Sequence, residues 1–213
     1  MKPHCTVVVL ISGNGTNLQA LIDASLSSNF KIVAVFSNNP DAYGLTRAQR
    51  DDIPAIVVNH RNFKDRQSFD QALLQQTEKF QPDLVVLAGF MRILGESFVQ
   101  HYVGRILNIH PSLLPNYPGI NTHQRVLDAG DQIHGVSVHF VDEDLDGGPI
   151  VAHAKVDVLA VDTAETLAAR VLTKEHLIYP HVVSWFAAGR LKLQAGKAWL
   201  DGQPLPPAGL EME

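Results

Sequence analysis

Two polar side chains, Asn108 and His110, end an apolar run and precede a loop with three prolines. The segment reads NIHPSLLPNYPG over residues 108–119. Side chains of a strand alternate between its faces, so this amide and this imidazole point to the same side. An amide N–H can stabilise an oxyanion, and an imidazole can move a proton. The pair therefore indicates acyl-transfer chemistry; the alternative is two polar groups satisfied by the loop backbone.

The acidic turn DEDLDGG, residues 142–148, offers His110 a partner. A carboxylate beside an imidazole fixes its tautomer and raises its pKa, and Asp146, directly before the glycines, is the candidate. The turn also matches the opening of a calcium loop, but His153 stands where a bidentate Glu is required, so calcium is not expected. A solvated turn between strands would explain the glycines and most of the acids.

No covalent nucleophile accompanies this set of side chains. The chain has no Gly-x-Ser-x-Gly elbow, and its single cysteine, Cys5, is expected before the first strand, where it plays no part. Direct transfer between two bound substrates is therefore the predicted chemistry. No closed cluster of metal ligands is visible, and His134, His139 and His153 are expected to be ordinary strand residues.

A second candidate site is the glycine loop SGNGTN, Ser12–Asn17, between a predicted strand and a predicted helix. Backbone N–H groups at a helix start bind anions, and glycines let a phosphate approach closely. Leu18 stands where the dinucleotide fingerprint needs a small residue, and the Lys-Ser/Thr of a P-loop is absent. The loop thus predicts a site for a bare phosphate group; an ordinary turn is the alternative.

Apolar runs alternate with helical patterns along the first half of the chain, as in parallel sheets covered by helices. The predicted strands are Thr6–Ser12, Lys31–Ser37, Ala55–Val58, Asp83–Gly89 and Arg105–Pro111. One helix is predicted directly after Asn17, a second over Leu45–Asp51 and a third over Asp65–Phe80. The predicted fold class is α/β, a Rossmann-like, mostly parallel sheet with helices on both faces.

The second half departs from that alternation. His134–Val141 and Gly148–Val158 are separated only by a turn, which predicts an antiparallel pair added to the sheet. A capping box over Asp162–Glu165 opens a helix expected to run to Tyr179, where Pro180 permits a kink or a break. LKLQAGKAWLDG predicts a closing hairpin.

Composition narrows the class of protein. The chain has 213 residues, a net charge of −5 and no Lys/Arg cluster, so nucleic acid is not an expected partner. The apolar run near the N-terminus is too short to span a membrane, and no signal-peptide cleavage pattern follows it. We expect a cytoplasmic protein with one domain over 1–213, a phosphate-binding half over 1–100 and a catalytic half over 101–213.

NIHPSLLPNYPG together with DLDGG resembles the signature of the folate-dependent formyltransferases. VVVLISGNGTNLQALIDA, AVFSN, VVLAGFMRIL and AWLDG extend the resemblance across nearly the whole chain, to the single-domain branch that acts on glycinamide ribonucleotide. The resemblance implies transfer of the formyl group of 10-formyltetrahydrofolate, the co-substrate, to the amine of glycinamide ribonucleotide in de novo purine biosynthesis, without a metal. It places the folate site in the half over 101–213.

The resemblance also implies roles for individual residues. The implied catalytic residues are Asn108, His110 and Asp146. The implied ribonucleotide contacts are Gly15, Thr16, Asn17 and Glu175; Thr16 stands where Ser is common and keeps the hydroxyl. The implied folate contacts are Arg66, Met91, Arg92, Ile93, Leu94, Asn108, Val141 and Asp146.

Four other functions compete with this prediction. Relatives act on methionyl-tRNA or on nucleotide sugars, but they carry additional domains for which 213 residues leave no room. A 10-formyltetrahydrofolate hydrolase would release formate without an amine acceptor. A non-catalytic module that binds a phosphate ligand would need a damaged catalytic trio, whereas all three residues are present. The expected partners are small molecules, and both a monomer and a homodimer remain open.

Overall fold

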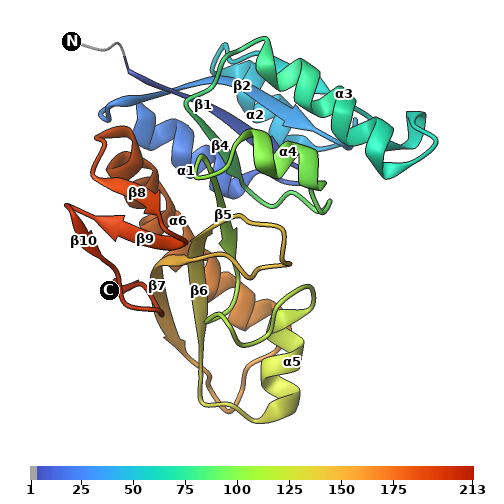
Figure 1. Cartoon of the computed structure of the whole chain (residues 1–213). Coiled ribbons are helices and arrows are strands. Elements are labelled where there is room, and N and C mark those ends of the chain that lie inside the picture. The colour runs from blue at the N-terminus through green and yellow to red at the C-terminus, as the bar shows by residue number, and fades with distance from the viewer. Residues whose placement is uncertain (1–3) are drawn as a thin grey trace. The chain divides into compact units, whose positions relative to one another are not determined.

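A computed structural model describes residues 4–213 (Figure 1). Its contacts divide the chain into two compact units, with the division between Leu107 and Asn108. The boundary falls inside strand β5 (Ile106–His110), so this strand begins in the first unit and ends in the second. Within the described residues, no helix combines the length and apolarity needed to cross a membrane.

The first unit is built on parallel strands. β1 pairs with β2 on one side and with β4 on the other, and β2 pairs with β3. Residues Val7–Ile11 of β1 are fully buried because the strand has neighbours on both edges and helices pack on the sheet. The elements are β1 (Cys5–Ile11), α1 (Thr16–Ser25), β2 (Phe30–Ser37), α2 (Tyr43–Arg50), β3 (Ala55–Val57), η1 (His60–Asn62), α3 (Arg66–Glu78), β4 (Leu84–Leu87) and α4 (Glu96–His101).

The second unit continues from β5 with a different strand pattern. β6 neighbours β5 and pairs antiparallel with β7, and β11 adds to β7 in parallel. A separate antiparallel sheet holds β8, β9 and β10, and α6 packs against β6 and β7 (Figure 1). The elements after β5 are α5 (Thr122–Ala129), β6 (Ile133–Phe140), β7 (Ile150–Asp157), α6 (Ala164–Ala187), β8 (Leu191–Gln194), β9 (Lys197–Leu200), β10 (Gln203–Pro204) and β11 (Leu210–Glu211).

The predicted fold class is confirmed: a mostly parallel sheet with helices and a few antiparallel strands. The bounds of each predicted strand lie within about two residues of those of an observed strand. The strands of the first unit were predictable because they are mostly continuous apolar runs. Phe69 and Leu73 lie on the buried face of α3. The predicted hairpin near the C-terminus is β8 and β9.

Several details differ from the sequence prediction. Cys5 lies within β1 rather than before it. The capping box is one residue further on, between Thr163 and Thr166, because the Thr166 hydroxyl accepts from the N-cap N–H in place of a Glu carboxylate. The last long helix does not end at Tyr179 but continues through Pro180 to Ala187. The sequence reading also omitted α4, α5, η1, β10 and β11.

Candidate active site

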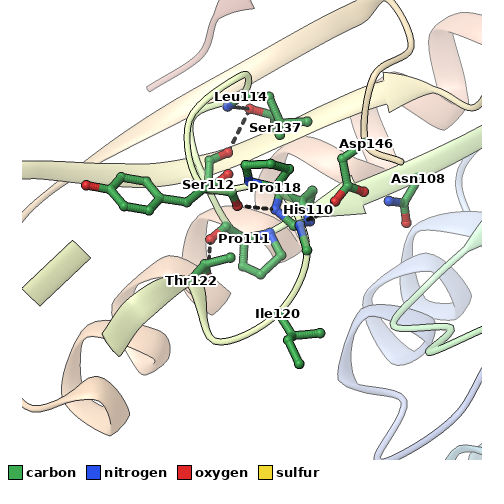
Figure 2. A network of polar contacts seen from close by, with 12 residues as sticks. Asn108, His110, Pro111, Ser112, Leu114, Pro118, Ile120, Thr122, Ser137 and Asp146 are labelled. Atoms are coloured by element: carbon green, nitrogen blue, oxygen red, sulfur yellow. Dashed lines mark hydrogen bonds and ion pairs between the residues drawn. The ribbon is translucent and has the colours of Figure 1, made fainter. Parts of the chain in front are cut away.

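His110, the last residue of β5, contacts two hydrogen-bond acceptors (Figure 2). Its Nε2 lies 2.9 Å from the carbonyl oxygen of Tyr117, and its Nδ1 lies 3.4 Å from Oδ2 of Asp146. A carbonyl and a carboxylate only accept hydrogen bonds, so protons on both ring nitrogens find a partner. The predicted pairing of Asp146 with His110 is therefore confirmed.

Asn108 is held by a residue that the sequence analysis assigned no role. His139, on β6, has Nδ1 2.8 Å from the carbonyl oxygen of Phe140, so this nitrogen carries the proton. Its Nε2 is then the acceptor for Nδ2 of Asn108, 3.1 Å away. Burial lowers the pKa of His139, which keeps the ring neutral and able to accept. His139 thereby fixes which way the amide of Asn108 faces.

His139 is a residue of strand β6, as expected, but its ring also contacts Asn108, which the sequence did not indicate. Its Nε2 lies 3.8 Å from Oδ1 of Asp146, so Asp146 is flanked by two imidazoles (His110 and His139). Figure 2 shows the carboxylate of Asp146 between His110 and Asn108. His139 lies near Asn108 because β6 is the neighbour of β5 in the sheet. The sequence alone did not predict that strand order, so it did not indicate the contact.

His134 and His153 do not join this cluster. Nε2 of His134 contacts Nδ1 of His123 at 3.0 Å, and Nδ1 of His153 lies 2.9 Å from the carbonyl oxygen of Ala208. Among the described residues, no group of three or more potential ligands could hold a metal ion.

The turn over residues 142–148 places Asp146 by its backbone shape. Asp146 has a positive φ of 52°, and its Oδ2 accepts a 2.8 Å hydrogen bond from the N–H of Gly119. At Gly148 a Cβ would collide with the carbonyl oxygen of Phe140, so only glycine fits there. The glycines therefore let the turn fold back toward the proline loop and carry Asp146 to His110.

The proline loop is fixed by side chains as well as by its prolines. The hydroxyl of Ser137, on β6, donates to the carbonyl of Ser112 at 2.8 Å and accepts from the N–H of Leu114 at 3.0 Å. Thr122, at the start of α5, donates to the carbonyl of Pro111 at 2.7 Å. Figure 2 shows these contacts around the loop. The backbone that presents Tyr117 to His110 is thus tied to β6 and α5.

The glycine loop in the first unit leads into α1 as predicted. Gly15 is the N-cap of α1, with φ 74° and no side-chain cap, and Thr16 and Asn17 begin the helix. A Cβ at Gly15 would lie 2.7 Å from the Cα of Gly44, so the loop requires glycine there. Arg47 on α2 was not predicted; its Nε donates to the carbonyl of Asn14 at 2.9 Å and brings a positive charge to the loop.

The remaining predicted contacts lie in separate parts of the chain. In the first unit, Nη2 of Arg66 donates to the carbonyl of Leu94 at 2.6 Å, which joins α3 to the segment Met91–Leu94. In that segment Met91, Arg92 and Ile93 are exposed and Leu94 is buried. In the second unit, Val141 directly follows β6 and Glu175 is largely buried on α6.

A family profile described as formyl transferase matches residues 5–183. The chain belongs to the formyl transferase family. Asn108, His110, His139 and Asp146 all lie within the matched range. The family assignment agrees with the resemblance drawn from the NIHPSLLPNYPG and DLDGG segments.

Similar formyl transferases are known in both sequence and structure. A phosphoribosylglycinamide formyltransferase from Escherichia coli is 55% identical over 205 residues, which is 95% of this chain and 97% of that protein. The enzyme of that name from Haemophilus influenzae is 49% identical over 97% of this chain and 99% of its own length. The solved structure of the Coxiella burnetii phosphoribosylglycinamide formyltransferase is 52% identical, covers 99% of this chain and 100% of its own, and superposes with a TM-score of 0.95.

Proposed function

We propose that this formyl transferase moves the formyl group of 10-formyltetrahydrofolate to the amine of glycinamide ribonucleotide in purine biosynthesis. The observation that carries the proposal is the contact of Nδ1 of His110 with Asp146 at 3.4 Å, beside an Asn108 oriented by His139. The names of the relatives, which cover nearly the whole chain, support the choice of acceptor. The proposed setting is the cytoplasm, with two small-molecule substrates as partners, whether the protein is a monomer or a homodimer.

The reaction begins with attack of the neutral amine on the formyl carbon. The carbon–oxygen π electrons move to the oxygen, which becomes an oxyanion. The amide N–H of Asn108 and the protonated ring of His110 are the proposed donors to this oxygen. At 3.4 Å, Nδ1 of His110 lies further from Oδ2 of Asp146 than in a short hydrogen bond, and we propose that the Nδ1–H also reaches the incoming oxygen.

Collapse of the oxyanion breaks the bond between the formyl carbon and N10 of the folate. The amine loses one proton and N10 gains one, so the transfer needs no external acid or oxidant. Asp146 keeps His110 charged while the oxyanion exists, because its carboxylate offsets the imidazolium charge. No covalent enzyme intermediate is required, and we assign no metal a role.

We assign the other predicted residues to the two substrates. The uncapped start of α1, with Gly15, Thr16 and Asn17, suits the ribonucleotide phosphate, and Arg47 adds positive charge there. Glu175 is the proposed further contact to the ribonucleotide. The proposed folate contacts are Arg66, Met91, Arg92, Ile93, Leu94, Asn108, Val141 and Asp146.

The test is a direct assay of both half-reactions. The protein is mixed with 10-formyltetrahydrofolate, with and without glycinamide ribonucleotide, while folate deformylation and formylated ribonucleotide are followed. We expect equal amounts of tetrahydrofolate and formylated product, and only when the ribonucleotide is present. Formate release without an acceptor would instead indicate a hydrolase. The absence of both products would reject the proposal.

A further inference from the structure

Asp70, on α3, is a buried carboxylate that the proposed mechanism does not use. The residue is 2% exposed, and its Oδ1 has no hydrogen-bond partner among residues 4–213. Burial raises the pKa of Asp70, against the lowering effect of Arg66 nearby. Burying this charge therefore lowers the free energy of unfolding, and a neutral side chain of the same shape would destabilise the fold less.

The carboxylate of Asp70 contacts two groups. Nε of Arg66, one helical turn earlier, lies 3.5 Å from Oδ2 of Asp70. The backbone N–H of Gly95, the N-cap of α4, donates a hydrogen bond to the carboxylate. A Cβ at Gly95 would collide with Oδ2, so glycine is needed for the backbone to approach this closely. Asp70 thus joins Arg66 to the peptide group of Gly95.

Arg66 holds the adjacent peptide group. Its Nη2 donates to the carbonyl of Leu94 at 2.6 Å, while its side chain stays 49% exposed. Arg66 and Asp70 together therefore hold two successive backbone positions, Leu94 and Gly95, against α3. A guanidinium fixed in this way keeps a defined orientation, because a carboxylate and a carbonyl both restrain it.

The opposite end of the same segment is fixed by Ser12, the residue after β1. Its hydroxyl oxygen accepts a 2.7 Å hydrogen bond from the N–H of Met91. Between the two fixed ends, the side chains of Met91 and Ile93 are 69% and 55% exposed. The segment 91–95 is thus a short strap, anchored at both ends, that presents apolar side chains to solvent.

We propose that Asp70 is a positioning residue for the formyl-donor site: through Arg66 and Gly95 it sets the strap 91–95 on which the folate binds. The inference rests on the proposed function, since it takes the folate as the ligand of the strap. It adds a residue outside the predicted contact set and explains why α3 keeps a carboxylate in a buried position. The strap side chains themselves remain free to contact the ligand.

The variant that tests this is Asp70→Asn. Asparagine keeps the volume and an oxygen that accepts from Gly95, but it removes the charge that restrains Arg66. We expect the Kd for tetrahydrofolate, measured by calorimetry, and the KM for the formyl donor to rise about tenfold, the loss of one charge-assisted contact. We also expect an unchanged KM for the ribonucleotide and an unchanged or higher midpoint of urea unfolding.

Arg66→Met tests the same contact from its other side. It changes a half-exposed residue and leaves Asp70 in place. Adding Asp70→Asn to Arg66→Met should change the Kd for tetrahydrofolate less than about twofold, since the two residues act as one unit. A further full tenfold loss in the double variant would contradict the proposed path through Arg66.

Asp162→Asn is the matched control. Asp162 also pairs with an arginine, Arg170, but in the second unit, at the start of α6. The Arg170 hydrogen bond lowers the pKa of Asp162, so its charge stabilises the fold, and its loss should lower the unfolding midpoint without changing folate binding.

The outcomes separate the possible failures. Normal folate binding by Asp70→Asn would overturn the inference. So would a loss of stability with equal changes in both KM values, because that pattern marks a purely structural residue. If the unaltered protein bound no tetrahydrofolate, the proposed function would fail, and this inference with it.

Discussion

His110 and the His123–His134 pair, all in the second unit, have opposite surroundings. His110 lies between the carbonyl of Tyr117 and the carboxylate of Asp146, so both ring nitrogens face acceptors. His123 and His134 face each other at 3.0 Å, so one nitrogen must accept and cannot carry a proton. Burial, together with the charges of His123 and His110, lowers the pKa of His134 to about 4.

The comparison shows that neighbours, not residue type, decide what a histidine can do. A carboxylate and a carbonyl both accept hydrogen bonds, so a ring with two protons, the form proposed to stabilise the oxyanion, finds a partner for each. An imidazole partner in an apolar setting favours the neutral ring, which suits packing between α5 and β6. Each of the predictions below tests one side of this contrast.

The largest effect is expected from removal of an oxyanion donor. Asn108→Ala and His110→Ala should each lower kcat by about 10²–10³-fold, with KM values largely kept, because each donor acts mainly in the transition state. Steady-state kinetics with both substrates varied would measure this. Near-normal turnover in either variant would disprove the assigned role.

Asp146→Asn removes the carboxylate charge next to His110 but keeps an oxygen for the N–H of Gly119. We expect kcat to fall about 10²-fold, because the imidazolium loses its counter-charge. Circular dichroism should show an unchanged fold. A kcat within twofold of the unaltered protein would mean that His110 needs no carboxylate partner.

His139→Ala is expected to have a smaller effect, because it acts through Asn108. Without the acceptor Nε2, the amide of Asn108 loses its fixed orientation, and kcat should fall about tenfold, the value of one hydrogen bond. His153→Ala, on the neighbouring strand β7, is the control and should leave kcat unchanged. An equal loss in both variants would point to damage to the sheet rather than to Asn108.

The smallest effect on activity is expected from the His123–His134 pair, which should control stability instead. The pKa of His134 is lowered in the folded state to about 4, whereas the unfolded chain binds the proton near pH 6.5. The unfolded chain therefore takes up the proton first as the pH falls below 6.5. The free energy of unfolding should drop by roughly 2–3 kcal/mol as the pH approaches 4. Urea unfolding from pH 7 to pH 4 would measure the slope.

His134→Gln removes this titration. The free energy of unfolding of the unaltered protein should therefore fall by roughly 2–3 kcal/mol more than that of the variant between pH 7 and pH 4. Asp131 and His110, which also act on His134, stay in place in both proteins. Parallel curves for the two proteins would show that the pair contributes nothing to the pH dependence.

The sequence allowed the strand framework to be predicted because buried parallel strands are continuous apolar runs. It was less informative for α4 and α5, which have 6 and 8 residues and too little periodicity to distinguish them from loops. Asp146 could be suggested as the partner of His110 because two glycines follow it in a turn. His139 could not, since its importance depends on which strand lies beside β5.

The sequence by itself determined the alternation of strands and helices and the shared face of Asn108 and His110. These properties follow from local backbone geometry and from side-chain periodicity. Only the tertiary structure decided which histidine faces a carboxylate and which faces another imidazole. The distance between residues far apart in the chain sets that difference: Asp146 lies beside His110, while His123 lies beside His134.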